Sequence, residues 1–283
     1  MAAVTETINL GVGVINPFTR SSGLTAMGAA TLDRLSGGRF ILGLGRSDKN
    51  LISGTLGLDY ENSLLKLNHY IVAIRDMLAS KSYGIRDDLK PINLAVRPVQ
   101  TPLPLYMAAI GPKAMKLAAK EADGVILNTY SPIAYIRRSI EIIKSALDEN
   151  ERDPNSFKIA CMLPVRLTGD VSDALINDCK YRIARILSEK FVGELFINVV
   201  SHTKYISSLR QFVYEQNKAE ICKLITNDMV DQYYVIGDQN HCVKRINEYI
   251  EAGVGQPLLL PRLADFMKVA EKLNPEIVMA YDN

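Results

Sequence analysis

The stretch PLYMAAIGPKAMKLAAKEADGVILN, residues 104–128, contains a complete strand–helix–strand unit. The apolar run PLYMAAIG (Pro104–Gly111) predicts a buried strand. PKAMKLAAKEA (Pro112–Ala122) predicts a helix that begins with proline, at a position where an N–H group has no helical partner in any case. GVILN (Gly124–Asn128) predicts the next strand. Two strands joined by a helix usually lie parallel in one sheet, so this stretch predicts an α/β fold.

The same alternation of strands and helices extends in both directions along the chain. Further strands are predicted at Ile8–Val14, Arg39–Gly45, Phe157–Thr168 and Gln256–Arg262, and further helices at Ser22–Ser36, Glu61–Ser80, Ser131–Asn150, Asp238–Gly253 and Ala264–Leu273. The strands are apolar on both faces, which is typical of buried parallel sheets. Residues 81–103 are predicted to form an insertion or flap, and residues 170–227 to be helical.

An open doubly wound sheet and a closed barrel both satisfy this alternation. No GxGxxG motif begins a helix after the first predicted strand, which counts against a dinucleotide-binding open sheet. Polar or glycine residues instead recur where successive strands end, at Asn16, Arg46–Lys49, Gly111 and Asn128. A site spread over many strand ends is typical of a (β/α)8 TIM barrel.

The composition narrows the class of function. The chain has 283 residues, 48% hydrophobic and 23% charged, with a formal net charge of +2, so no basic surface for nucleic acid is predicted. The longest apolar stretches are far shorter than a membrane span, and the N-terminus has no features of a secretory signal. The four cysteines and three histidines match no metal-site or CxxC spacing. We therefore expect a cytoplasmic protein with reduced thiols, no bound metal and a small-molecule substrate.

Four segments, taken in order, resemble the bacterial luciferase-like oxidoreductase superfamily. They are GVGVINPFTR (Gly11–Arg20), ATLDRLSGGRFILGLGRSDK (Ala30–Lys49), the 104–128 stretch and EAGVGQPLLLPR (Glu251–Arg262). The chain is most similar to the deazaflavin-dependent branch that includes methylenetetrahydromethanopterin reductase. The resemblance implies a TIM barrel of the luciferase-like type, coenzyme F420 or FMN as cofactor, and assembly as a homo-oligomer.

The resemblance also implies that the barrel is incomplete at its N-terminus. In the family, a strand like Ile8–Val14 is the third of eight, so residues 1–283 are expected to form a single barrel domain that lacks the first two βα units. The Ile8–Val14 strand would then have an unpaired edge, which is a liability for aggregation and which dimerisation would cover.

The resemblance assigns cofactor contacts to the ends of four strands. The expected residues are Gly13, Val14, Asn16, Gly45, Ser47, Ala109, Ile110, Gly111, Asn128 and Thr129. In the family, a non-prolyl cis peptide backs the flat ring, and the matching bond is Gly13–Val14. Free N–H groups at the helix that begins after Gly111 suit a phosphate, as does the Asn128–Thr129 strand end. A purely structural role for the glycines, as relief of crowding, is the alternative.

The RSDK loop supplies the charged candidates. Asp48 is the expected catalytic carboxylate, for proton transfer or for a hydrogen bond to ring or pterin nitrogens. Arg46 and Lys49 are the expected substrate-binding residues: Lys49 would attract acidic groups, and Arg46 would narrow the pocket or add a phosphate contact. Arg20 has two interpretations: a contact to an anionic part of the cofactor or substrate, or a solvated side chain. Asp33 and Arg39 are expected to stabilise the helix-to-strand turn by an ion pair or a cap.

These features lead to one main functional hypothesis and two alternatives. The main hypothesis is hydride transfer between coenzyme F420 and a small or pterin-type substrate, which needs orientation and a shielded ring face more than a nucleophile. The first alternative is an FMN-dependent luciferase-like monooxygenase. The second is a truncated, non-catalytic paralogue that binds a flavin or a partner subunit.

Overall fold

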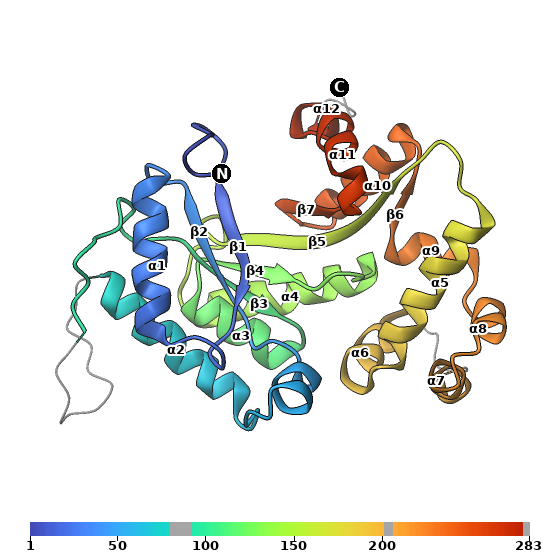
Figure 1. Ribbon diagram of the computed structural model, residues 1–283, viewed down its shortest axis with the longest axis horizontal. Coiled ribbons are helices and arrows are strands. Elements are labelled where there is room, and N and C mark those ends of the chain that lie inside the picture. The colour runs from blue at the N-terminus through green and yellow to red at the C-terminus, as the bar shows by residue number, and fades with distance from the viewer. Residues whose placement is uncertain (80–91, 201–205, 280–283) are drawn as a thin grey trace. The chain divides into compact units, whose positions relative to one another are not determined.

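The computed structural model describes residues 1–79, 92–200 and 206–279 (Figure 1). Strands alternate with helices along the chain, and the strand pairs whose registers are defined are parallel. The predicted α/β class is therefore confirmed. The eight-stranded barrel and the absence of its first two βα units stay predictions. No helix among the described residues is long and apolar enough to cross a membrane.

The chain divides into two compact units. Unit 1 comprises Met1–Ile126 and Ile143–Lys158, and unit 2 comprises Leu127–Ile142 and Ile159–Asn283. The predicted insertion at residues 81–103 lies partly outside the described residues. Its described part, residues 92–103, contains no helix and only an isolated bridge at Ile92.

Unit 1 contains the first strands in sequential order. They are β1 (Leu10–Ile15), β2 (Phe40–Leu44), β3 (Leu105–Ala109) and β4 (Gly124–Leu127), whose last residue belongs to unit 2. Its helices are α1 (Ser22–Leu35), the short π-helix η1 (Asn50–Thr55), α2 (Ser63–Leu78) and α3 (Pro112–Glu121). In the strand order β1 is terminal and pairs with β2, and its residues alternate between half-buried and exposed. The outer edge of β1 therefore pairs with no strand of the described chain, as expected.

The helix-to-strand turn between α1 and β2 is stabilised by two side chains acting separately. Asp33 is fully buried, and its carboxylate accepts hydrogen bonds from Val99 N (2.7 Å), Gln100 N (2.9 Å) and Gln100 Nε2 (2.6 Å). Arg39 donates from Nε to Ser36 O (2.6 Å) and from Nη2 to Thr5 O (2.7 Å). The structural role predicted for both residues is confirmed. The expected ion pair between them is not present, because Asp33 is occupied by a segment 66 residues away in sequence.

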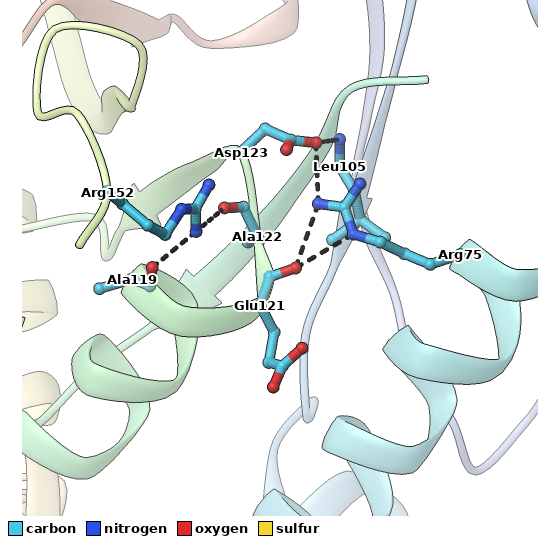
Figure 2. A network of polar contacts seen from close by, with 7 residues as sticks. All are labelled: Arg75, Leu105, Ala119, Glu121, Ala122, Asp123 and Arg152. Carbon is cyan, nitrogen blue, oxygen red and sulfur yellow. Dashed lines mark hydrogen bonds and ion pairs between the residues drawn. The ribbon is translucent and has the colours of Figure 1, made fainter. Parts of the chain in front are cut away.

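A polar network stabilises the amino ends of β3 and β4 (Figure 2). Arg75 of α2 binds the Asp123 carboxylate (2.9 Å) and donates twice to Glu121 O (3.1 Å each), at the C-terminus of α3. Asp123 also accepts from Leu105 N (2.8 Å), and Arg152 donates to two further carbonyls near the end of α3. Polar groups at the amino ends of parallel strands typically serve stability, so this end carries no candidate site.

Unit 2 is built around a long strand. β5 (Lys158–Leu167) pairs in parallel with β6 (Val235–Gly237) and with β7 (Gln256–Leu260). The segment predicted as helical forms α5 (Asp173–Ser188), α6 (Lys190–Val200), α7 (Ile206–Tyr214) and α8 (Lys218–Leu224), followed by α9 (Asn227–Tyr233). The remaining helices are α10 (Gln239–Glu251), the 3-10 turn η3 (Leu263–Asp265), α11 (Phe266–Lys272) and α12 (Pro275–Met279). Helix α4 (Ile133–Glu149) has residues in both units.

Candidate cofactor and active site

The carboxyl ends of β1, β2 and β3 touch one another at Gly45. A Cβ atom added to Gly45 would lie 2.7 Å from Val14 Cγ2 and 3.2 Å from Ala108 Cβ. Gly45 N donates to Ile15 O (2.9 Å), so the end of β2 is also tied to the end of β1 by a hydrogen bond. The three predicted strand ends therefore meet, and a side chain at Gly45 would displace its neighbours.

The end of β1 has the irregular backbone that the resemblance implied. The Gly13–Val14 peptide is cis, and the pairing with β2 changes register between Val12 and Ile15. A Cβ atom at Gly43 would lie 2.0 Å from Val12 O, so β2 needs a second glycine to pass this part of β1. The expected cis peptide is confirmed.

The turn after β1 is organised by Asn16. Its side-chain Oδ1 accepts hydrogen bonds from Phe18 N (2.9 Å), Thr19 N (3.1 Å) and Thr19 Oγ1 (3.2 Å). The carbonyl oxygen of this amide is thus used by the turn, as is common for asparagine in loops. A ligand contact from Asn16 would come from its amide nitrogen, and that contact stays a prediction.

An aromatic pair joins the loop after β1 to the segment after β2. Phe18 stacks on Tyr60 with ring centroids 5.2 Å apart, and Lys66 Nζ lies 4.7 Å from the Phe18 centroid. The Tyr60 hydroxyl donates to Ser47 O (2.9 Å). Ser47 has a φ of 64°, an uncommon conformation for a non-glycine residue. Sequence reasoning missed Tyr60 because the contact with the loop is non-local and no motif marks it.

The charged loop residues lie together, and Asp48 has a structural role. Its Oδ1 accepts hydrogen bonds from Asn50 N (2.8 Å) and Leu51 N (3.1 Å), which caps η1. Arg46 is half-buried and donates weakly to Ser63 Oγ (3.4 Å), whereas Asp48 and Lys49 are exposed. Capping uses one carboxylate oxygen. The catalytic role of Asp48 and the substrate contacts of Arg46 and Lys49 stay predictions.

The junction of β3 and α3 has the expected local geometry. Ala109 is buried, Ile110 is half-buried, and Gly111 has a φ of 86°, which only glycine adopts readily. Pro112 is the first residue of α3, and no side chain caps this helix. An uncapped helix N-terminus suits an anionic group. The phosphate contact proposed for this junction stays a prediction.

The last two predicted contacts, Asn128 and Thr129, belong to unit 2. Asn128 O accepts a hydrogen bond from Ser131 Oγ (2.8 Å). The Thr129 hydroxyl oxygen is buried and has no hydrogen-bond partner among the described residues. A buried hydroxyl without a protein partner is uncommon, and this one is available to a ligand.

The strand ends of unit 1 bring together small and apolar residues. The residues that meet there are Val14, Gly45 and Ala108, which present small or apolar surfaces. Neither a nucleophile–base pair nor a set of metal ligands accompanies them, and the described part of the chain contains no group of three or more His, Cys, Asp or Glu residues that could hold a metal. Such a surface can position a redox ring, which performs the chemistry itself.

Comparison with known proteins identifies the family of this chain. The sequence profile described as luciferase-like monooxygenase matches residues 1–256. The chain is 28% identical to the 5,10-methylenetetrahydromethanopterin reductase of Methanolobus tindarius, across 90% of this chain and 78% of that protein.

Solved structures show the same fold. The coenzyme F420-dependent tetrahydromethanopterin reductase from Methanopyrus kandleri superposes with a TM-score of 0.79 at 23% identity, over 99% of this chain and 85% of that one. The oxygenating constituent of 3,6-diketocamphane monooxygenase from Pseudomonas putida, in complex with FMN, gives a TM-score of 0.62 at 16% identity, over 98% and 81% of the two chains.

Proposed function

Because this chain belongs to the luciferase-like monooxygenase family, we propose that it is an oxidoreductase that moves a hydride between coenzyme F420 and a small or pterin-type substrate. The observation that carries the proposal is the similarity to the Methanolobus reductase, which extends over 90% of this chain. The structural similarity to a coenzyme F420-dependent reductase supports it. Assembly as a homo-oligomer is part of the proposal, since it would cover the outer edge of β1.

The residues proposed to hold the ring are those at the ends of β1, β2 and β3. Val14, Gly45 and Ala109 would contact its face, and Asn16 would donate from its amide nitrogen to a ring oxygen or nitrogen. Gly13 and Ser47 would contact the ring through their backbone. The cofactor, when bound, supplies the hydride, so these residues orient the ring, exclude water and shield one of its faces.

The phosphate-bearing part of the cofactor is proposed to contact backbone or hydroxyl donors. Ile110 and Gly111 precede the uncapped N-terminus of α3, whose N–H groups favour an anion. Asn128 and Thr129 offer a second set of donors, and the unpartnered hydroxyl of Thr129 supports this assignment.

Three charged residues are proposed to act on the substrate. Arg46 and Lys49 would attract its acidic groups. Asp48 would hold or move a proton through the carboxylate oxygen that does not cap η1, or would accept a hydrogen bond from a pterin nitrogen. An Asp48→Asn variant keeps an oxygen for the cap, so a loss of turnover with unchanged stability would separate the two roles.

Anaerobic titration of the purified chain with oxidised coenzyme F420 and with FMN tests the proposal. We expect saturable binding of coenzyme F420, and hydride exchange once a pterin substrate is added. Binding of neither cofactor would refute the proposal and favour a non-catalytic paralogue.

An FMN-dependent monooxygenase is the second candidate, because the FMN-bound monooxygenase from Pseudomonas putida has the same fold. Oxygen consumption distinguishes the two functions: a monooxygenase consumes oxygen when supplied with reduced FMN and a substrate, whereas an F420-dependent reductase does not.

A further inference from the structure

Arg166 is a buried cation at the penultimate position of β5. It is 7% exposed, and the described residues form no ion pair with it. Its Nη1 donates to Val165 O (2.7 Å), while its Nε is buried and has no hydrogen-bond partner. A guanidinium has five N–H donors and keeps its charge at all ordinary pH values. Most of its hydrogen-bonding capacity is therefore unused within the protein.

The groups beside Arg166 do not neutralise it. Its guanidinium carbon lies 5.4 Å from the ring centroid of Tyr234, and its charge also acts on the thiol of Cys179. Burial raises the pKa of both groups above their ordinary values, so both are neutral near pH 7. The aromatic face compensates part of the charge. A buried charge with no carboxylate partner is costly, which makes Arg166 a poor choice for stability alone.

Hydroxyl groups lie next to this cation. The hydroxyls of Tyr234 and Tyr130 are 3.2 Å apart, and their rings meet edge to face with centroids 5.1 Å apart. Tyr130 follows Thr129, whose hydroxyl is buried without a partner, as is the Nε of Arg166. All four residues belong to unit 2. Arg166 thus lies against the ring of Tyr234, which is hydrogen-bonded to Tyr130, and Tyr130 follows Thr129 in the sequence.

We propose that Arg166 and the Tyr130 hydroxyl form a binding site for an oxyanion, a phosphate or carboxylate group of a small ligand, with Thr129 at its margin. Arginine donates two parallel N–H bonds to such groups, and tyrosine and threonine hydroxyls donate one each. An oxyanion would supply both the missing counter-charge and the missing acceptors. The proposal rests on unit 2 alone and does not depend on which redox cofactor the chain uses.

Thermal unfolding of the full chain in inorganic phosphate tests the site, with chloride used to keep the ionic strength constant. We expect a saturable rise in Tm for the wild type, since a ligand of the native state stabilises it. Arg166→Met should abolish this rise, and its Tm in chloride should equal or exceed that of the wild type, because an unpaired buried charge has been removed. Arg166→Lys should raise the half-saturating phosphate concentration about tenfold or more.

Two further variants keep the test decisive if Arg166→Met does not fold. Tyr130→Phe removes only the hydroxyl and should weaken phosphate binding several-fold. Because this hydroxyl also accepts the hydrogen bond of buried Tyr234, the Tm in phosphate is compared with the variant's own, lowered Tm in chloride. Arg262→Gln is the matched control: Arg262 is an exposed arginine paired with Asp265 (2.8 Å), and the variant should respond to phosphate like the wild type. A wild-type chain that shows no saturable rise, or an Arg166→Met variant that responds like the wild type, would overturn the proposal.

A repeat of the phosphate titration with saturating coenzyme F420 identifies the source of the oxyanion. Loss of the phosphate effect would show that the cofactor's own phosphate occupies the site, and persistence would assign it to the substrate. If the chain binds phosphate but not coenzyme F420, the oxyanion site stands and the proposed function fails.

Discussion

Replacing Gly45 by alanine places a methyl group where the ends of three strands already touch. The new Cβ would lie 2.7 Å from Val14 Cγ2 and 3.2 Å from Ala108 Cβ, whereas carbon atoms in contact normally lie about 3.5–4.0 Å apart. Overpacking of this kind costs about 1–3 kcal/mol. Alanine also lowers the conformational entropy of the unfolded chain, which stabilises the native state by about 0.4–1 kcal/mol. We expect Gly45→Ala to lower the free energy of unfolding by about 1–2 kcal/mol.

A double-mutant cycle with Val14→Ala shows whether this contact is the cause. Val14→Ala removes Cγ2, and with it the nearest atom to the new methyl group. The double variant should therefore lose at least about 1 kcal/mol less than the two single variants together. Urea unfolding measures the stabilities, and titration with coenzyme F420 measures binding. Gly45→Ala should weaken binding about tenfold if the three strand ends hold the ring, and the double variant should recover part of that loss.

Gly54→Ala is the matched control, since an added Cβ there meets no atom within 4 Å. Its stability should not fall and should rise by about 0.4–1 kcal/mol, because only the restriction of the unfolded chain remains. Additive losses in the cycle would refute the packing argument. Unchanged cofactor binding in Gly45→Ala, with the expected loss of stability, would instead refute the placement of the ring at these strand ends.

Three other predictions concern stability. Asp33→Ala leaves the donors of residues 99–100 without their acceptor and should cost about 1–3 kcal/mol in urea unfolding; an unchanged stability would contradict the role given to this carboxylate. Asp123→Asn removes the charge from the network in Figure 2 and should cost about 1–3 kcal/mol, and an unchanged midpoint in urea would count against that network. Burial raises the pKa of Cys161 and Cys242 to about 12 from an ordinary value near 9. These thiols therefore deprotonate at lower pH in the unfolded chain than in the folded chain. The free energy of unfolding should fall as the pH rises from about 9 to 12. Each thiol should contribute about 1 kcal/mol to that fall by pH 10, and the same fall in a variant with both cysteines replaced by alanine would rule out this cause.

The strand–helix–strand stretch shows what local signals can predict. The expected elements at 104–111, 112–122 and 124–128 agree with β3, α3 and β4 to within about two residues at each end. An apolar run, a proline that begins a helix and a glycine with positive φ act within a few residues of one another, so sequence spacing is enough to place them. The cis peptide at Gly13–Val14 was implied by the family resemblance, because no local rule predicts it.

Other features could not be read from the sequence. Strand β6 has three residues and exists through its pairing with β5, about 70 residues away, so the sequence around it carries too little pattern. Asp33 and Arg39 were expected to form an ion pair or a cap at the turn, but the structure gives Asp33 donors from a distant segment, residues 99–100. Arg166 was available as a signal, since it is the one arginine inside the apolar strand FKIACMLPVRLT.

By itself, the sequence determined the α/β class, the order of the elements and the strand ends at which a cofactor site is expected, since periodicity and turn chemistry act over short distances along the chain. Tertiary structure alone decided that Val14, Gly45 and Ala108 meet, that Asp48 caps η1 while Tyr60 binds the neighbouring loop, and that Arg166 is buried beside Tyr234. These contacts join residues whose separation in sequence bears no relation to their separation in space. They form only when the strands lie side by side and the close packing of the interior selects which side chains meet.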